Sequence, residues 1–119
     1  MHLHYSGQHF MRKAQIEFNI ALDENNLPSQ IQWNASDAGE KGLSKAIMLA
    51  MWDEKEQNTM RIDLWTKDML VDDMKKFMHQ TLVTMADTMQ RATGEEQICQ
   101  DMRDFATYFA VQMKLVDPE

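Results

Sequence analysis

The sequence is poor in residues that crosslink a chain, since Cys99 is its only cysteine. One cysteine excludes an internal disulfide and a zinc site built from several cysteines, and it is compatible with a reducing compartment. We expect Cys99 to serve as a packing residue. Residues 1–10 hold most of the histidines but show neither a strand nor a helix period, so we predict a disordered leader or tag. A flexible terminus offers no fixed ligand geometry, and no metal site is expected.

Long apolar runs and basic stretches are also missing. No segment approaches the roughly 18 to 20 uninterrupted apolar residues needed to cross a bilayer, and the start of the chain lacks the pattern of a cleaved signal. The expected location is therefore the cytoplasm, with peripheral contact to the inner membrane left open. A formal net charge of -7, with 12 scattered Lys and Arg, disfavours nucleic acid as a partner.

Residues that could build a catalytic or cofactor site are few. The 4 glycines fall singly, so there is no glycine-rich loop to cradle a phosphate, and no cofactor is expected. His79 is the only histidine beyond the leader, and its position among polar helix residues favours a surface side chain over a general base. Acidic pairs such as Asp23-Glu24 and Asp53-Glu54 lie in predicted turns without the ligand spacing of a calcium loop. We predict no catalytic residue and no enzymatic activity.

The residues that are present, 44% hydrophobic and 26% charged, are typical of a folded chain with one core. We predict a single α+β domain over residues 11–116, followed by a C-terminal tail at 117–119. Apolar residues at every second position predict two strand hairpins, each joined by a polar turn. The predicted strands span residues 13–22, 29–34, 45–52 and 59–65, and residues 36–42 are expected to form a mobile loop.

After Trp65 the apolar period changes to that of a helix, which predicts a long helix with methionines along its apolar face. Thr93-Gly94-Glu95-Glu96 has the pattern of a capping box and predicts the start of a second helix. The predicted fold is a two-layer α+β sandwich, in which a four-stranded antiparallel sheet is followed by a hairpin of two long α-helices in the order ββββαα. Its predicted core comprises Ile16, Phe18, Ile20, Ile31, Trp33, Leu49, Ile62, Leu64, Phe77, Leu82, Phe105 and Phe109.

The second hairpin carries an unusually apolar outer face. If Leu49 pairs with Ile62 and Met51 with Met60, the intervening residues share the opposite face of the sheet. Exposed aromatic and methionine side chains of this kind are typical of protein interfaces. We therefore predict a partner-binding surface, which we call the tryptophan face, made of Met48, Trp52, Arg61, Asp63 and Trp65. A homodimer that stacks these faces is its simplest use.

Several runs of the sequence are distinctive, namely Leu22-Asp23-Glu24-Asn25-Asn26, Ile31-Gln32-Trp33, Met51-Trp52-Asp53, Arg61-Ile62-Asp63-Leu64-Trp65-Thr66-Lys67-Asp68-Met69, Gln80-Thr81-Leu82 and Met102-Arg103-Asp104-Phe105. Together these runs resemble the GldC family of gliding motility proteins from Bacteroidetes. The resemblance extends over most of residues 11–115 and implies a bacterial accessory protein of surface gliding, a machinery tied to type IX secretion. It implies no enzymatic activity, cofactor or catalytic residue. Leu70 stands where the family pattern suggests a proline.

Two alternatives stay open beside the docking of one folded component of the gliding machinery. The order of four strands and two helices is similar to that of the SecB export chaperone, so the chain could hold unfolded export clients. Similarity of element order alone does not transfer function. An enzyme that uses Asp63 or His79 is the third and least favoured hypothesis.

Overall fold

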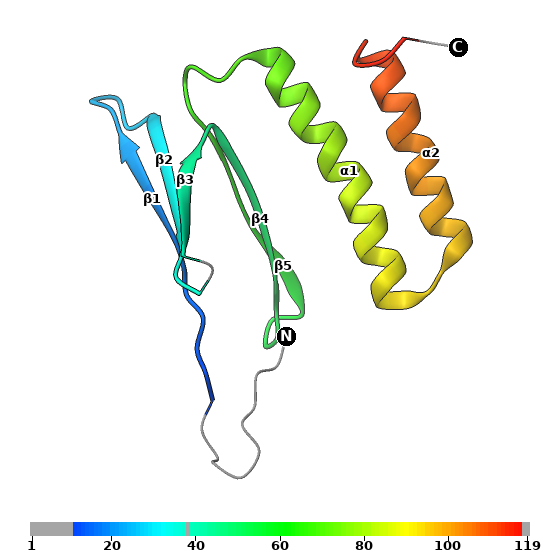
Figure 1. The fold of residues 1–119 in the computed structure, drawn as a ribbon, viewed down its shortest axis with the longest axis horizontal. Coiled ribbons are helices and arrows are strands. Elements are labelled where there is room, and N and C mark those ends of the chain that lie inside the picture. Colours follow the sequence, from blue (N-terminus) through cyan, green and yellow to red (C-terminus); the bar gives the residue numbers. More distant parts are fainter. Residues whose placement is uncertain (1–10, 38, 118–119) are drawn as a thin grey trace. The chain divides into compact units, whose positions relative to one another are not determined.

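A computed structural model describes residues 11–37 and 39–117 of the chain (Figure 1). The predicted leader, residues 1–10, and the last two residues of the predicted tail lie outside the described residues. Packing of the backbone divides the chain into two units that meet between Asp68 and Met69, each described by itself below. The single domain predicted over residues 11–116 stays a prediction. The elements are β1 (Ile16–Leu22), β2 (Pro28–Ala35), β3 (Glu40–Ser44), β4 (Ala46–Asp53), β5 (Asn58–Trp65), α1 (Val71–Thr93) and α2 (Glu96–Gln112).

The first sheet is antiparallel in the order β1-β2-β3. Its register sets Phe18 beside Trp33 and Ile20 beside Ile31, so the apolar residues of both strands share one face. The predicted first hairpin is thereby confirmed. Asp23 closes its turn, because Oδ1 accepts hydrogen bonds from the amides of Asn25 (2.8 Å) and Leu27 (3.0 Å).

The mobile loop predicted over residues 36–42 is wrong in its second half, because Glu40–Ser44 forms β3 and pairs with β2. Gly42 gave the misleading loop signal. It lies opposite Trp33, and a Cβ added there would come within 3.0 Å of Trp33 Nε1. The glycine therefore leaves room for the indole to cover the strand, a role that glycine takes where another group approaches the backbone closely.

The second sheet is the hairpin of β4 and β5, with the predicted register: Leu49 pairs with Ile62 and Met51 with Met60. The predicted single four-stranded sheet in the order ββββαα is wrong, because the described strands form one sheet of three and one of two. The cause is a bend at Lys45, where β3 passes into β4 (Figure 1). Beyond this bend β4 pairs with β5, so the second hairpin does not extend the first sheet.

Residues 66–68, directly after β5, join the two sheets. Thr66 is buried and donates its amide to Lys45 O (2.8 Å), which continues the β4–β5 ladder. The amide of Lys67 donates instead to Pro28 O at the start of β2 (3.0 Å). Asp68 accepts hydrogen bonds from Lys45 Nζ (2.8 Å) and Thr66 Oγ1 (2.7 Å). Thr66, Lys67 and Asp68 of the Arg61–Met69 run thus have a structural role, because their hydrogen bonds reach the starts of both β2 and β4.

The second unit is the hairpin of α1 and α2. Arg103 of α2 pairs with Asp87 of α1, with Nη2 and Oδ1 3.1 Å apart. The side chains that are buried in this unit are all small, which allows the helices to approach closely. They are Ala86, Cys99, Ala106 and Ala110. The packing role predicted for Cys99 agrees with its complete burial.

The capping box predicted at Thr93–Glu96 is wrong. Thr93 is the last residue of α1, and its hydroxyl donates back to Met89 O at 2.8 Å. Residue Glu95 occupies the N-cap of α2 without a side-chain cap hydrogen bond. Between the helices, Gly94 adopts a left-handed conformation (φ 71°) and closes α1 by donating to Gln90 O. The Thr93 hydroxyl also accepts a hydrogen bond from the amide of Glu95 (3.2 Å), one residue short of the Glu96 amide that a capping box requires. Its donation to the preceding turn of α1 is the bond that a hydroxyl inside a helix commonly makes.

The predicted core is only partly confirmed. Ile31 is completely buried, and Trp33, Leu49, Leu64, Phe77, Leu82 and Phe109 are half-buried. The remaining predicted core residues are exposed, namely Ile16, Phe18, Ile20, Ile62 and Phe105.

Candidate partner-binding surface

The register of β4 and β5 brings all five residues of the tryptophan face onto one side of the hairpin. Opposite residues share a face, and Met48 lies opposite Asp63, Ala50 opposite Arg61 and Trp52 opposite Thr59. At the other end Ala46 lies opposite Trp65. The two tryptophans thus mark the ends of the face, 64% and 56% exposed respectively, and Met48 is half-buried between them.

The middle of the tryptophan face carries an ion pair between Arg61 and Asp63. The guanidinium donates twice, from Nη2 to Oδ1 at 2.8 Å and from Nε to Oδ2 at 3.2 Å. These hydrogen bonds lower the pKa of the Asp63 carboxyl and raise the pKa of Arg61. Asp63 is therefore held as a carboxylate with a fixed orientation, suited to recognition of a polar group and poorly suited to accepting a proton.

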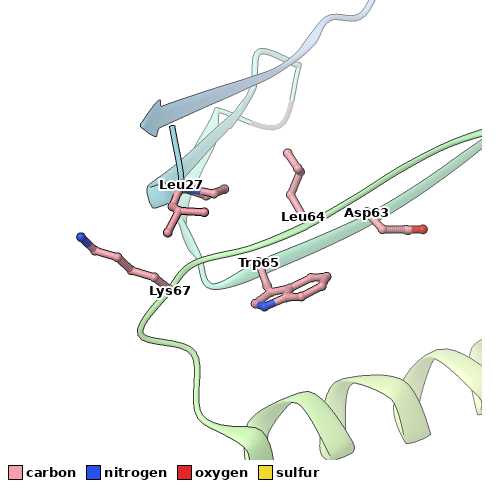
Figure 2. Close-up of a pocket in the computed structure, with 6 residues that line it drawn as sticks. Leu27, Asp63, Leu64, Trp65 and Lys67 are labelled. Carbon is pink, nitrogen blue, oxygen red and sulfur yellow. The ribbon is translucent and has the colours of Figure 1, made fainter. Parts of the chain in front are cut away.

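A hollow of about 360 Å³ lies beside this face and is lined by Leu27, Pro28, Asp63, Leu64, Trp65 and Lys67 (Figure 2). Leu64 and Trp65 project to opposite sides of β5, as consecutive strand residues do (Figure 2). A hollow that touches both faces of β5 and no residue of β4 must lie along the outer edge of β5, the edge turned away from β4.

The far wall of the hollow is the β1–β2 turn, which Lys67 holds in place. Its Nζ lies 2.9 Å from Asp23 Oδ2, and the Asp23 side chain is 15% exposed. The hydrogen bond from Lys67, followed by that from the Leu27 amide, lowers the pKa of Asp23 to about 2. At the next residue in the sequence, hydrogen bonds from Lys45 and Thr66 lower the pKa of the Asp68 carboxyl. Ionised carboxylates therefore fix this end of the strand unit at neutral pH.

Sequence reasoning missed Leu27, Pro28 and Lys67 as neighbours of the tryptophan face. They come from a turn and from a segment some 40 residues further along the chain, and no local pattern links them. One signal in the sequence could have pointed to Lys67. The charged residues of the Thr66-Lys67-Asp68 run directly follow a predicted strand, and they are not part of its alternation of apolar and polar residues.

The helical unit has an open groove of its own, of about 400 Å³. It is lined by Thr84, Met85, Thr88, Met89, Ala92 and Met102, and Met85 is 51% exposed. Met85 and Met89, two of the methionines predicted along the apolar face of the helix, thus line an open groove. Within residues 11–37 and 39–117 no group of three or more His, Cys, Asp or Glu could hold a metal ion. No described helix combines the length and apolarity needed to cross a bilayer.

Comparison with known families matches residues 28–115 to the family described as "Gliding motility-associated protein GldC-like". The match starts at the first residue of β2 and extends past the end of α2, so it includes β5 and the residues that join the sheets. Neither a curated protein nor a solved structure gives a significant match.

Proposed function

The chain belongs to the GldC-like family of gliding motility-associated proteins, and we propose that it is a non-enzymatic accessory protein of the gliding machinery that acts by binding another protein. The proposed partner is a component of the gliding or secretion machinery. The family name supports the process, and the tryptophan face supports the mode of action.

The arrangement of the tryptophan face is the observation that carries this proposal. Tryptophan and arginine are enriched among the few residues that carry most of the binding energy of protein interfaces. Here Trp52 and Trp65 flank the Arg61–Asp63 pair on a hairpin with a defined register. A partner would gain apolar area from the two indoles and orientation from the ion pair.

The electrostatics of the same residues support a binding role over catalysis. Asp63 is paired with Arg61 and its pKa is lowered, the opposite of the raised value that a general acid at neutral pH requires.

The test is co-purification from the native organism with the chain as bait. We expect Trp52→Ala and Trp65→Glu to lose an identified gliding or secretion component while circular dichroism stays that of the parent protein. Tyr108→Ala is the matched control, because Tyr108 is an exposed aromatic (58%) of the helical unit. Retention of the component by both folded tryptophan variants would overturn the proposal. Suppression of aggregation of unrelated unfolded proteins would instead support a holding chaperone.

A further inference from the structure

The outer edge of β5 is an open site for strand pairing. In the described part of the chain, β5 pairs with β4 alone, and a two-stranded hairpin is at best marginally stable in water. An edge strand of eight residues presents unpaired backbone groups to any extended segment. The edge of β3 differs, because β3 is short and starts with Glu40 and Lys41, which are typical of protected edges.

The charges on β5 select one partner for this edge. We propose that β5 pairs antiparallel with β5 of a second copy of the chain, centred on Ile62. This register sets Arg61 opposite the second copy's Asp63, and Asp63 opposite the second copy's Arg61. Opposite charges directly across an antiparallel pair are stabilising, and like charges are destabilising. Parallel pairing in register would set Arg61 opposite Arg61 and Asp63 opposite Asp63. An antiparallel pair centred on Arg61 or on Asp63 would likewise set that residue opposite its own copy, so like charges would face each other.

The same register matches the apolar residues. Ile62 lies opposite Ile62 of the second copy, and Met60 lies opposite the second copy's Leu64. The hollow along the outer edge of β5 adjoins Leu64, so it lies where the second copy's Met60 would arrive. Met60 and Ile62 are 51% and 46% exposed in the single chain, and the pairing would cover part of both.

The product is a four-stranded sheet in the order β4-β5-β5-β4 with a twofold axis at Ile62. Each copy offers the same edge and the same hollow, which is the self-complementarity that a twofold interface requires. One face of this sheet is continuous and apolar, built twice from Ile47, Leu49, Met51, Met60, Ile62 and Leu64. The other face carries two copies of the tryptophan face. The inference goes beyond the proposed function, and its test needs no other protein.

The first experiment measures the dimer by sedimentation velocity and exploits the charge pattern. Arg61→Asp alone would gather four carboxylates at the axis, and Asp63→Arg alone would gather four guanidinium groups. We expect each variant to raise the dimer Kd roughly tenfold or more, and the double exchange to restore it. Mixing the two single variants should produce heterodimers, because each then offers the complement of the other. Circular dichroism checks that both variants fold.

Mixing separates this proposal from a purely intrachain role of the Arg61–Asp63 pair. An intrachain pair cannot be repaired by a second protein, so mixed variants would stay monomeric, and that result would overturn the proposal. A parent protein that remains monomeric up to about 1 mM would overturn it too. So would a dimer that neither single variant weakens, since its interface would lie elsewhere.

A cysteine scan tests the register in the full chain. Ile62→Cys would lie opposite its own copy with Cα atoms about 5 Å apart, which suits a disulfide. Met60→Cys and Leu64→Cys are matched controls, because each would lie about 14 Å along the strand from its copy. We expect oxidation to crosslink the Ile62→Cys protein at least tenfold faster than either control. Equal rates at the three positions would overturn the register.

Discussion

The two units of the chain bury their side chains in opposite ways. The helical unit buries small residues such as Ala106 and Ala110 and leaves large ones such as Phe105 and Tyr108 exposed. The described part of the strand unit completely buries Ile31 and nearly completely buries Thr66, while Phe18 and Ile62 stay substantially exposed. The helical hairpin therefore depends on close backbone approach, and the strand unit depends on one apolar anchor and the hydrogen bonds around residues 66–68. Most of the large apolar surface of either unit is thus available for association.

Truncation of Ile31 should have the largest effect and tests whether the strand unit has one dominant anchor. Ile31→Ala deletes buried methyl groups and should lower the free energy of unfolding by about 3 kcal/mol. Ile16→Ala makes the same chemical change at a side chain that is 66% exposed, and should cost less than about 1 kcal/mol. Urea denaturation measures both. Equal losses of unfolding free energy in the two variants would show that the two isoleucines are buried alike in solution. The strand unit would then have no single dominant anchor.

Enlargement of Ala106 tests the close approach of the helices. Ala106 is 1% exposed, so Ala106→Leu has no room for its added carbons and should cost about 2 kcal/mol through overpacking. The control is Ala92→Leu, at an exposed position of α1 that lines the groove, where we expect a change within about 0.5 kcal/mol. Thermal unfolding compares them. A neutral Ala106→Leu would mean that the helices separate easily.

The sequence predicted those parts of the fold that rest on local periods. Alternation and turn residues located the two hairpins and the register of β4 with β5, and the change of period after Trp65 located the helices. It failed at β3, where Gly42 serves a tryptophan of the neighbouring strand, and at Lys45, where a bend ends one sheet and begins another. Both failures arise from contacts between strands that no single segment reveals.

The candidate site was predictable to the same extent. Once the register was fixed, the five residues of the tryptophan face had to share one side of the hairpin. The hollow at the edge of β5 was not predictable. One of its walls is the β1–β2 turn, which is held by the ion pair of Lys67 with Asp23, and these two residues are far apart in the sequence. The ion pair of Arg61 with Asp63 follows from their i, i+2 spacing on a strand.

Replacement of Gly94 examines the connection of the helical unit. With φ at 71°, Gly94→Ala should cost about 1 kcal/mol, because a Cβ strains the left-handed conformation. Gly94→Asn is the matched variant, since asparagine tolerates this conformation better, and it should lose less. Thermal unfolding ranks the two. Alanine equal to asparagine would show that the helix end relaxes without cost.

The smallest expected effect concerns the ion pair that holds the β1–β2 turn of the strand unit. Lys67→Met removes the main cause of the lowered pKa of Asp23, so that pKa should rise from about 2 toward the ordinary 3.8. A carboxyl with a lowered native pKa adds stability above its unfolded pKa and loses it as the pH falls through the native value. The parent protein should therefore exceed Lys67→Met in stability above pH 4, and the difference should shrink between pH 4 and pH 2.

NMR titration of the Asp23 carboxyl and urea denaturation at pH 5 and pH 2 measure the two halves of this prediction. Lys75→Met is a suitable control, because it removes a lysine from the helical unit and leaves the turn unchanged. Since the Lys67 side chain is 54% exposed, high salt should weaken the Lys67 effect. A pKa of Asp23 that stays near 2 in Lys67→Met would contradict this prediction. The hydrogen bonds from the turn amides to Asp23 would then cause the lowered pKa, and Lys67 would not be needed to stabilise the turn.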